Sequence, residues 1–181
     1  GGSAYISEQI WRQVVELKKV KPVVVSMGNV AASGGYYISC AANKIIAEPN
    51  TLTGSIGIFG MFPNASGLFG KLALTTDIVK TNTFSDLGDL SRPMTESEKA
   101  LIQGYVERGY QTFLSRCAEG RGMTTEAVNA IGQGRVWTGE QAKERGLVDE
   151  LGGIELAIST AAGVADLDQY SVTTVSGSKN F

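Results

Sequence analysis

Apolar residues in this chain follow two patterns, short β-branched runs and longer stretches with helical spacing. The valines at 23–25 follow Pro22 and predict a buried strand. Similar runs predict further strands at 44–47, 55–59, 74–79, 136–138 and 170–175. Helical spacing predicts helices at 36–42, 125–131, 139–145 and 154–164, and a first helix with Ile6, Ile10, Val14 and Leu17 on one face. Strands separated by helices favour crossover connections in a mostly parallel sheet.

The longest helix is predicted to begin beside Thr95. Thr95 and Glu98 have the spacing of a capping box, and the apolar stripe behind them continues until Arg121 and Gly122 end the helix. We expect this helix to pack on the sheet, with its aromatic residues in the core. The glycine-rich apolar segment 57–70 indicates either core packing around a short helix or an apolar surface that contacts a subunit or a substrate.

The turn behind the valine strand carries the first candidate for chemistry. Gly28 and Asn29 are expected to break the strand, because both residues tolerate positive φ angles. Small residues follow, and Ser33 lies among them just before the next helix. A strand, a sharp turn with a serine and then a helix form a nucleophile elbow, in which the following N–H groups face an oxyanion. The alternative is a turn that only lets the helix pack close to the strand, since the Gly-x-Ser-x-Gly spacing is absent.

Length and composition are those of one ordinary domain, expected over residues 1–181 with a frayed tail at 176–181. A chain of 181 residues that is 43% hydrophobic can form a single core. The net charge of −2 gives no electrostatic footprint for nucleic acid. No run of 18 apolar residues and no signal peptide occur. The chain opens on a glycine pair inside a functional motif, so we expect a fragment whose N-terminal part and any anchor are missing.

The sequence contains no histidine, and this restricts the chemistry that is available. A Ser-His-Asp triad and a histidine-ligated metal are excluded within the chain, so a base for Ser33 has to be a lysine, a carboxylate or a group from elsewhere. No metal or other cofactor is expected, because no Gly-rich phosphate loop follows a strand and the loop carboxylates form no convincing set. Cys40 and Cys117 are expected to be buried free thiols.

Five motifs follow one another along the chain. They are Gly-Gly-Ser-Ala at 1–4, Ala-Ala-Ser-Gly-Gly-Tyr-Tyr at 31–37, Leu-Thr-Gly-Ser-Ile-Gly at 52–57, Val-Trp-Thr-Gly at 136–139 and Ala-x-x-x-Gly-Leu-Val-Asp at 142–149. In this order they make the chain resemble the signal peptide peptidase A (protease IV) family of membrane-associated serine proteases. The resemblance covers essentially the whole chain and is strongest to the C-terminal half of the two-domain form.

The resemblance implies roles for four residues. Ser33 is the nucleophile, and the backbone N–H groups of Gly2 and Gly34 form the oxyanion hole. Ser55 hydrogen-bonds the lysine that acts as general base. From the residues alone, the alternative for the glycine pair is a plain helix start. The alternative for Ser55 is the usual role of a serine at a strand start, which is to satisfy a local backbone group.

The chain departs from the family at the position of the lysine. In catalytically complete domains of the family a lysine follows the aromatic residue, whereas here Ser85 follows Phe84. Such a lysine serves as a base only when burial lowers its pKa from about 10.4. Lys80 lies five residues upstream and is expected to be a surface charge rather than a substitute base. In the two-domain form the N-terminal half keeps the lysine, so the resemblance implies a missing N-terminal domain that supplies the base.

The resemblance further implies an α/β fold of the ClpP/crotonase type, with repeated ββα units and a mostly parallel sheet flanked by helices. The implied activity is hydrolysis of cleaved signal peptides and other apolar peptides by a Ser/Lys dyad. The implied setting is a homo-oligomer, a tetramer, at the bacterial inner membrane with the catalytic domain on the periplasmic side. No nucleic acid partner is implied.

Two other functions remain open at this point. A crotonase-type acyl-CoA enzyme would use the same oxyanion geometry for an enolate without a serine nucleophile, and tight binding of acyl-CoA would support it. A non-catalytic binding or assembly domain would explain the missing lysine as lost chemistry. Activity regained on adding the lysine-bearing half would exclude that second alternative.

Overall fold

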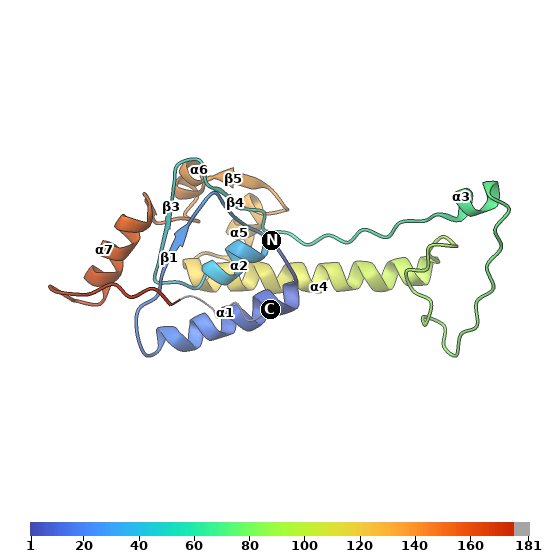
Figure 1. Ribbon diagram of the computed structural model, residues 1–181, viewed down its shortest axis with the longest axis horizontal. Coiled ribbons are helices and arrows are strands. Elements are labelled where there is room, and N and C mark those ends of the chain that lie inside the picture. Colours follow the sequence, from blue (N-terminus) through green and yellow to red (C-terminus); the bar gives the residue numbers. More distant parts are fainter. Residues whose placement is uncertain (176–181) are drawn as a thin grey trace.

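The computed structural model describes residues 1–175, which form a body of strands and helices and a long arm, the extended part of the connection between residues 54 and 96 (Figure 1). The strands are β1 (Val24–Met27), β2 (Val30–Ala32), β3 (Lys44–Ala47), β4 (Leu52–Gly54), β5 (Val136–Thr138) and β6 (Glu150–Leu151). The helices are α1 (Ala4–Lys18), α2 (Gly34–Ser39), α3 (Ser66–Lys71), α4 (Glu96–Arg121), α5 (Thr125–Ile131), α6 (Gly139–Glu144) and α7 (Ile154–Val164). The predicted frayed tail at 176–181 lies outside the described residues.

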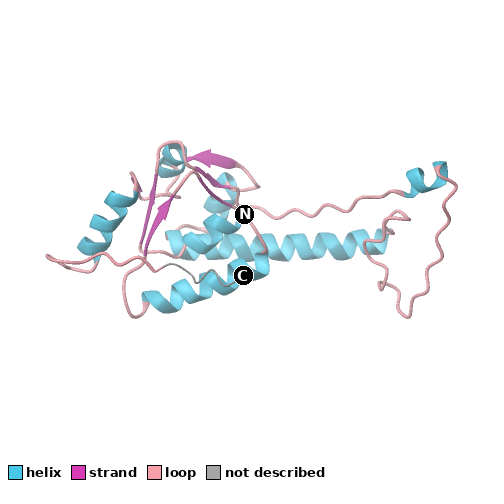
Figure 2. Cartoon of the chain, in the orientation of Figure 1, coloured by secondary structure: helices cyan, strands magenta, loops and turns pink. Residues whose placement is uncertain are grey.

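The strands form two small sheets that lie in the body (Figure 2). The first has the order β1-β3-β6 and is parallel throughout. The second has the order β2-β4-β5, with β2 and β4 parallel and β4 and β5 antiparallel. Helices lie between successive parallel strands, which the alternating pattern predicted. The mostly parallel α/β fold expected from the sequence is therefore confirmed.

Several predicted strands were wrong. The strand predicted at 55–59 is instead β4, which ends at Gly54 because Gly54 and Ser55 both have positive φ angles and leave the extended path. Segments 74–79 and 170–175 form no strand; nearly all their residues are exposed, and neither pairs with a strand. Strand β2 was missed because it has only three residues. The break before it falls at Gly28 and Asn29 as expected, although neither residue has a positive φ angle.

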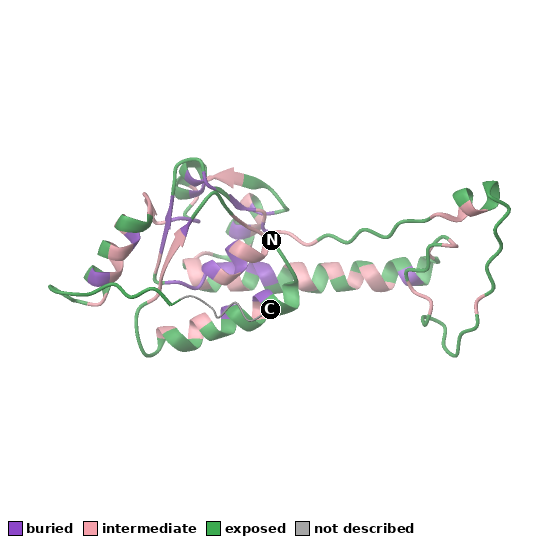
Figure 3. Ribbon diagram, viewed as in Figure 1, coloured by how far each residue is buried: buried purple, intermediate pink, exposed green. Residues whose placement is uncertain are grey.

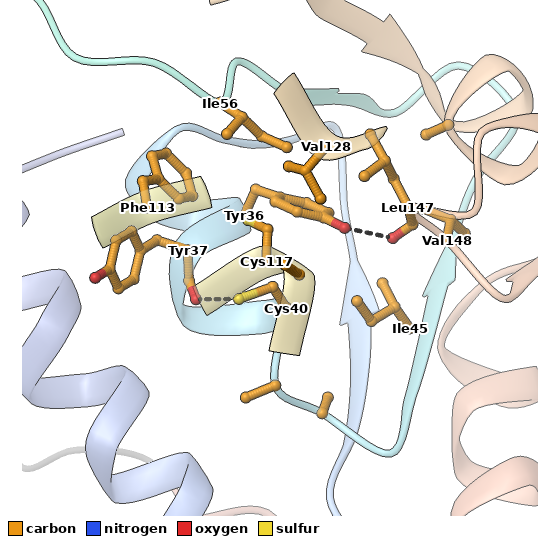
Figure 4. Close-up of a cluster of buried hydrophobic side chains, with 14 of the residues drawn as sticks. Tyr36, Tyr37, Cys40, Ile45, Ile56, Phe113, Cys117, Val128, Leu147 and Val148 are labelled. Atoms are coloured by element: carbon orange, nitrogen blue, oxygen red, sulfur yellow. Dashed lines mark hydrogen bonds between the residues drawn. The ribbon is translucent and has the colours of Figure 1, made fainter. Parts of the chain in front are cut away.

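The core surrounds α2. The side chain of Tyr36 is fully buried, and its hydroxyl donates a hydrogen bond to the carbonyl oxygen of Leu147 at 3.0 Å (Figure 4). Burial raises the pKa of Tyr36 well above its usual range. The predicted buried free thiols, Cys40 and Cys117, lie in the same cluster. Helix α2 starts at Gly34, two residues earlier than predicted, and ends at Ser39, three residues earlier than predicted. These buried groups therefore lie directly behind the turn that carries Ser33.

Helix α4 begins with the predicted capping box. Thr95 Oγ1 accepts from the N–H of Glu98, and the Glu98 carboxylate accepts from the N–H of Thr95. The C-terminal half of α4 packs in the body, where Phe113 is buried. Its N-terminal half projects from the body on the same side as the exposed arm (Figure 3). The expectation that all its aromatic residues are in the core was wrong, because Tyr105 is 62% exposed. The prediction failed because the spacing of apolar residues does not show how much of a long helix lies over the body of the protein.

Helix α1 turns a different face to the core from the one predicted. Ser7 and Trp11 are its buried residues, whereas Ile6 and Ile10 are exposed. Trp11 packs in the main cluster, so the face of the helix that carries its large ring is the buried one. Ser7 is buried because it faces Gly34. None of the helices within residues 1–175 is both long enough and apolar enough to cross a bilayer.

We predict that the free energy of unfolding falls in acid through Glu98. Hydrogen bonds from Arg92, and then from the Thr95 N–H, lower the pKa of this buried carboxyl from 4.5 to about 2. A carboxyl with a lowered folded-state pKa stabilises the fold above its unfolded-state pKa, and this contribution is lost as the pH falls from 4.5 toward 2. In Glu98→Gln the melting temperature should fall less over that window. The matched control is Glu96→Gln on the same turn, which is exposed and should keep the wild-type slope; identical slopes in all three proteins would contradict the prediction.

Candidate active site

Ser33 occupies a strained turn between β2 and α2. Its φ and ψ angles are 55° and −117°, a combination that residues with a side chain rarely adopt. Two backbone hydrogen bonds hold the turn, from the Ser33 N–H to the Gly54 carbonyl at 2.9 Å and from the Tyr37 N–H to the Ser33 carbonyl at 2.8 Å. This is the geometry of a nucleophile elbow, which presents the side chain at the head of a helix. The turn at Ser33 therefore has the shape of a nucleophile elbow although its sequence lacks the Gly-x-Ser-x-Gly spacing.

Gly2 and Gly34 lie next to each other beside this serine. A Cβ atom added to Gly34 would lie 3.2 Å from the Gly2 nitrogen and 2.7 Å from Ser7 Oγ, so only glycine permits this approach. Within the described residues neither the Gly2 N–H nor the Gly34 N–H has a hydrogen-bond partner. Two free N–H groups next to the partly buried Ser33 can bind the oxygen of a polarised carbonyl. The structure thus brings the two predicted oxyanion donors together.

Ser55 occupies the position after β4 that Ser33 occupies after β2. Because Ala32 pairs with Gly54 in the parallel register, the two serines leave neighbouring strands at the same edge. Ser55 also has a positive φ angle, 50°, and its N–H donates to the Arg135 carbonyl at 2.7 Å. Both serines are partly buried and line one cavity. The structure therefore brings all four predicted site residues to one place.

Two cavities meet at Ser33. The smaller, of about 300 Å³, lies between α1, α2 and α4, and Tyr37 and Phe113 form part of its wall. The larger, of about 920 Å³, contains Ser55 and is bordered by Tyr110 of α4. The segment 57–59 lines both cavities. Because they share Gly2, Ser33 and the segment 57–59, the two cavities form one cleft that is open to Ser33 from two sides.

No lysine within residues 1–175 lines this cleft. Lys80 lies in the arm, where its ammonium contacts Asp86 at 2.9 Å, and Arg92 binds the same carboxylate. Hydrogen bonds from Arg92 and then from Lys80 lower the pKa of Asp86 below its usual range. Lys80 is therefore part of an ion-pair cluster at the start of α4, as the expected surface charge, and does not contact Ser33.

Sequence reasoning missed a charged group in the smaller cavity. The Glu8 carboxylate on α1 accepts a hydrogen bond from the Tyr37 hydroxyl and another from Arg116 Nη2 at 2.7 Å. Burial raises the pKa of Glu8, but the bonds from Arg116 and Tyr37 outweigh it and leave the pKa below its usual value. Burial and then Glu8 raise the pKa of Tyr37. Arg116 is 108 residues from Glu8, so no local spacing could have revealed the pair.

Known structures agree with this fold. The chain resembles a mutant of ClpP1 from Listeria monocytogenes with a TM-score of 0.52 and 19% identity, over 87% of this chain and 71% of that one. The likeness shows a ClpP-like α/β fold, in which Ser33 lies on a strained turn beside free N–H groups. The sequence profile of peptidase family S49 matches residues 15–168. The chain belongs to peptidase family S49.

Relatives from bacteria and plants cover almost all of this chain. Protease 4 of Salmonella typhi is 42% identical over 94% of it, and Protease 4 of Haemophilus influenzae is 43% identical over 89%. The chloroplastic serine protease SPPA of Arabidopsis thaliana is 39% identical over 92%. The chain spans 28%, 26% and 25% of the length of these three relatives, respectively. The expected membership in the signal peptide peptidase A family is confirmed, and the chain corresponds to about a quarter of these proteins.

Proposed function

We propose that this domain hydrolyses peptide bonds with Ser33 as the nucleophile. The observation that carries the proposal is the strained φ angle of Ser33 at the head of α2, beside the free N–H groups of Gly2 and Gly34. A backbone angle that costs free energy persists where the surrounding structure enforces it, as at catalytic turns. Membership in family S49 supports the same conclusion.

The reaction follows from the positions of these groups. Ser33 Oγ attacks the carbonyl carbon of the scissile bond and passes its proton to a base, while the N–H groups of Gly2 and Gly34 bind the oxyanion. The amine leaves with that proton, and water then hydrolyses the acyl-enzyme. Each oxyanion donor contributes about 3 kcal/mol to lowering the barrier.

The base in this proposal is a lysine from a region outside this chain, hydrogen-bonded by Ser55. The larger cavity, which contains both serines, has room for such a side chain. Burial there would lower the pKa of the lysine and leave it neutral. The proposed source is an N-terminal domain, which agrees with the small share of each relative that this chain spans.

The proposed substrates are cleaved signal peptides and other apolar peptides. The apolar Ile58 and Phe59 line both cavities and support an extended, apolar substrate. The proposed setting is a homo-oligomer, with four copies by resemblance, at the bacterial inner membrane with this domain on the periplasmic side. The ClpP-like fold is compatible with such an assembly.

A fluorophosphonate probe tests the proposed nucleophile directly. We expect peptide mass spectrometry to find the probe on Ser33 when this chain is joined to its native N-terminal region, and not on the chain alone. Labelling of the isolated chain would contradict a base supplied from outside. Absence of labelling in both forms would contradict the peptidase proposal and favour a binding or assembly domain.

A further inference from the structure

Glu8 is the one charged residue among those described that line the smaller cavity beside Ser33; the others are uncharged. Ser33 and Gly34 line this cavity together with Tyr37 and Phe113, whose rings pack at 4.6 Å between centroids. Glu8 from the second turn of α1 completes the wall. A substrate side chain next to the attacked carbonyl would enter this space, because the cavity adjoins both the nucleophile and the oxyanion donors.

The carboxylate of Glu8 lies between this cavity and a cation. Arg116 Nη2 donates to Oε1 at 2.7 Å, Arg116 Nε donates to Oε2 at 3.3 Å, and the Tyr37 hydroxyl donates to Oε2. Arg116 itself does not line the cavity, and its guanidinium lies 4.0 Å from the centre of the Trp11 ring. The stacking and the two hydrogen bonds hold the guanidinium against Glu8 from outside the cavity lining.

This arrangement neutralises the charge that a substrate would otherwise meet. An unpaired carboxylate in an apolar cavity attracts lysine and arginine side chains, whereas a carboxylate that is already bound by a guanidinium offers no net charge. A charged substrate side chain would then lose its hydration without gaining a partner, which costs free energy. An uncharged side chain does not have this cost.

We propose that the Glu8–Arg116 pair, oriented by Tyr37, determines the charge preference of this cavity and restricts it to uncharged side chains next to the scissile bond. The inference rests on the proposed peptidase function and adds the residues that select the substrate. Glu8 contacts the substrate in this proposal, whereas Arg116 acts through Glu8.

The test uses the complete natural protein and peptides that differ only at the residue whose carbonyl is attacked. Norleucine is compared with lysine, and glutamine with glutamate, because each pair has similar length and differs in charge. Wild-type kcat/KM should favour the uncharged member of each pair. In Arg116→Met the Glu8 carboxylate loses its cation, so the kcat/KM of the lysine peptide should rise about ten-fold relative to that of the norleucine peptide. In Glu8→Gln the Arg116 guanidinium loses its anion, so the kcat/KM of the glutamate peptide should rise relative to that of the glutamine peptide.

Opposite shifts in these two variants are the signature of a charge effect, since a general loss of packing would lower all four values together. Arg116→Lys keeps the positive charge and should retain the wild-type preference. Arg108→Met, on the same helix but over Tyr105, is the matched control and should change nothing. Melting temperatures show which variants fold. If Arg116→Met does not fold, the substrate preference of Glu8→Gln decides the question.

Two results would overturn the inference. One is an unchanged preference in Arg116→Met and Glu8→Gln while both variants still hydrolyse peptides. The other is a shift in Arg116→Lys as large as that in Arg116→Met, which would assign the effect to packing. Failure of the underlying function is distinguishable, because the wild-type protein would then neither hydrolyse the uncharged peptides nor accept the probe on Ser33.

Discussion

Replacing Ser33 by alanine should abolish peptide hydrolysis and leave the fold intact. Loss of a serine nucleophile lowers kcat by about 10⁶-fold in a serine peptidase. Ser33 Oγ makes no hydrogen bond within the described residues, so the melting temperature should stay within about 2 °C of the wild type. The measurement is kcat in the complete natural protein together with a thermal melt.

Replacing the same serine by glycine separates catalysis from backbone strain. At φ 55° and ψ −117° the residue has the mirror image of an extended conformation, which glycine adopts freely. Ser33→Gly should therefore be inactive but more stable than Ser33→Ala by about 1 kcal/mol. Ser115→Ala, on the surface of α4, is the control with unchanged activity. Retained hydrolysis in Ser33→Ala, with a large fall in melting temperature, would instead show a turn that serves packing.

Replacing Gly34 by alanine should lower kcat by about 100-fold, the typical cost of losing one oxyanion donor. The new Cβ would lie 2.7 Å from Ser7 Oγ and 3.2 Å from the Gly2 nitrogen, so the two N–H groups could not keep their spacing. Gly35→Ala is the matched control. Its Cβ would lie 3.8 Å from that of Ala31, an ordinary contact, and activity should stay within about three-fold of the wild type.

A double variant distinguishes the two contacts that Gly34→Ala disturbs. Adding Ser7→Ala removes the hydroxyl at 2.7 Å but leaves the close approach to the Gly2 nitrogen. The loss of activity should therefore persist in Gly34→Ala/Ser7→Ala. Full recovery would mean that the contact with the Ser7 side chain caused the loss, and it would contradict the explanation that the Gly34 Cβ displaces the Gly2 N–H.

Local signals predicted the elements whose stabilising contacts are close in sequence. The capping box of Thr95 and Glu98 and the left-handed Gly122 that ends α4 are contacts over a few residues, and both occur as predicted. Strands 74–79 and 170–175 were wrong because a strand also needs a neighbour, and the valine and threonine content of a segment does not provide one. The site motifs around Ser33 and Ser55 were visible in the sequence, but their adjacency depends on the register of β2 and β4.

The amino-acid sequence was sufficient to identify the family motifs, most helices and the absence of a histidine base, since each depends on residue identity and short spacing. Only the tertiary structure decided which face of α1 is buried, the strained φ angle of Ser33 and the pairing of Glu8 with Arg116. These features depend on contacts between segments far apart in the chain, because burial and ion pairing are properties of the packed molecule. The chemistry is therefore encoded in local motifs, whereas the geometry that directs it, and the charge of the cavity beside it, arise from packing.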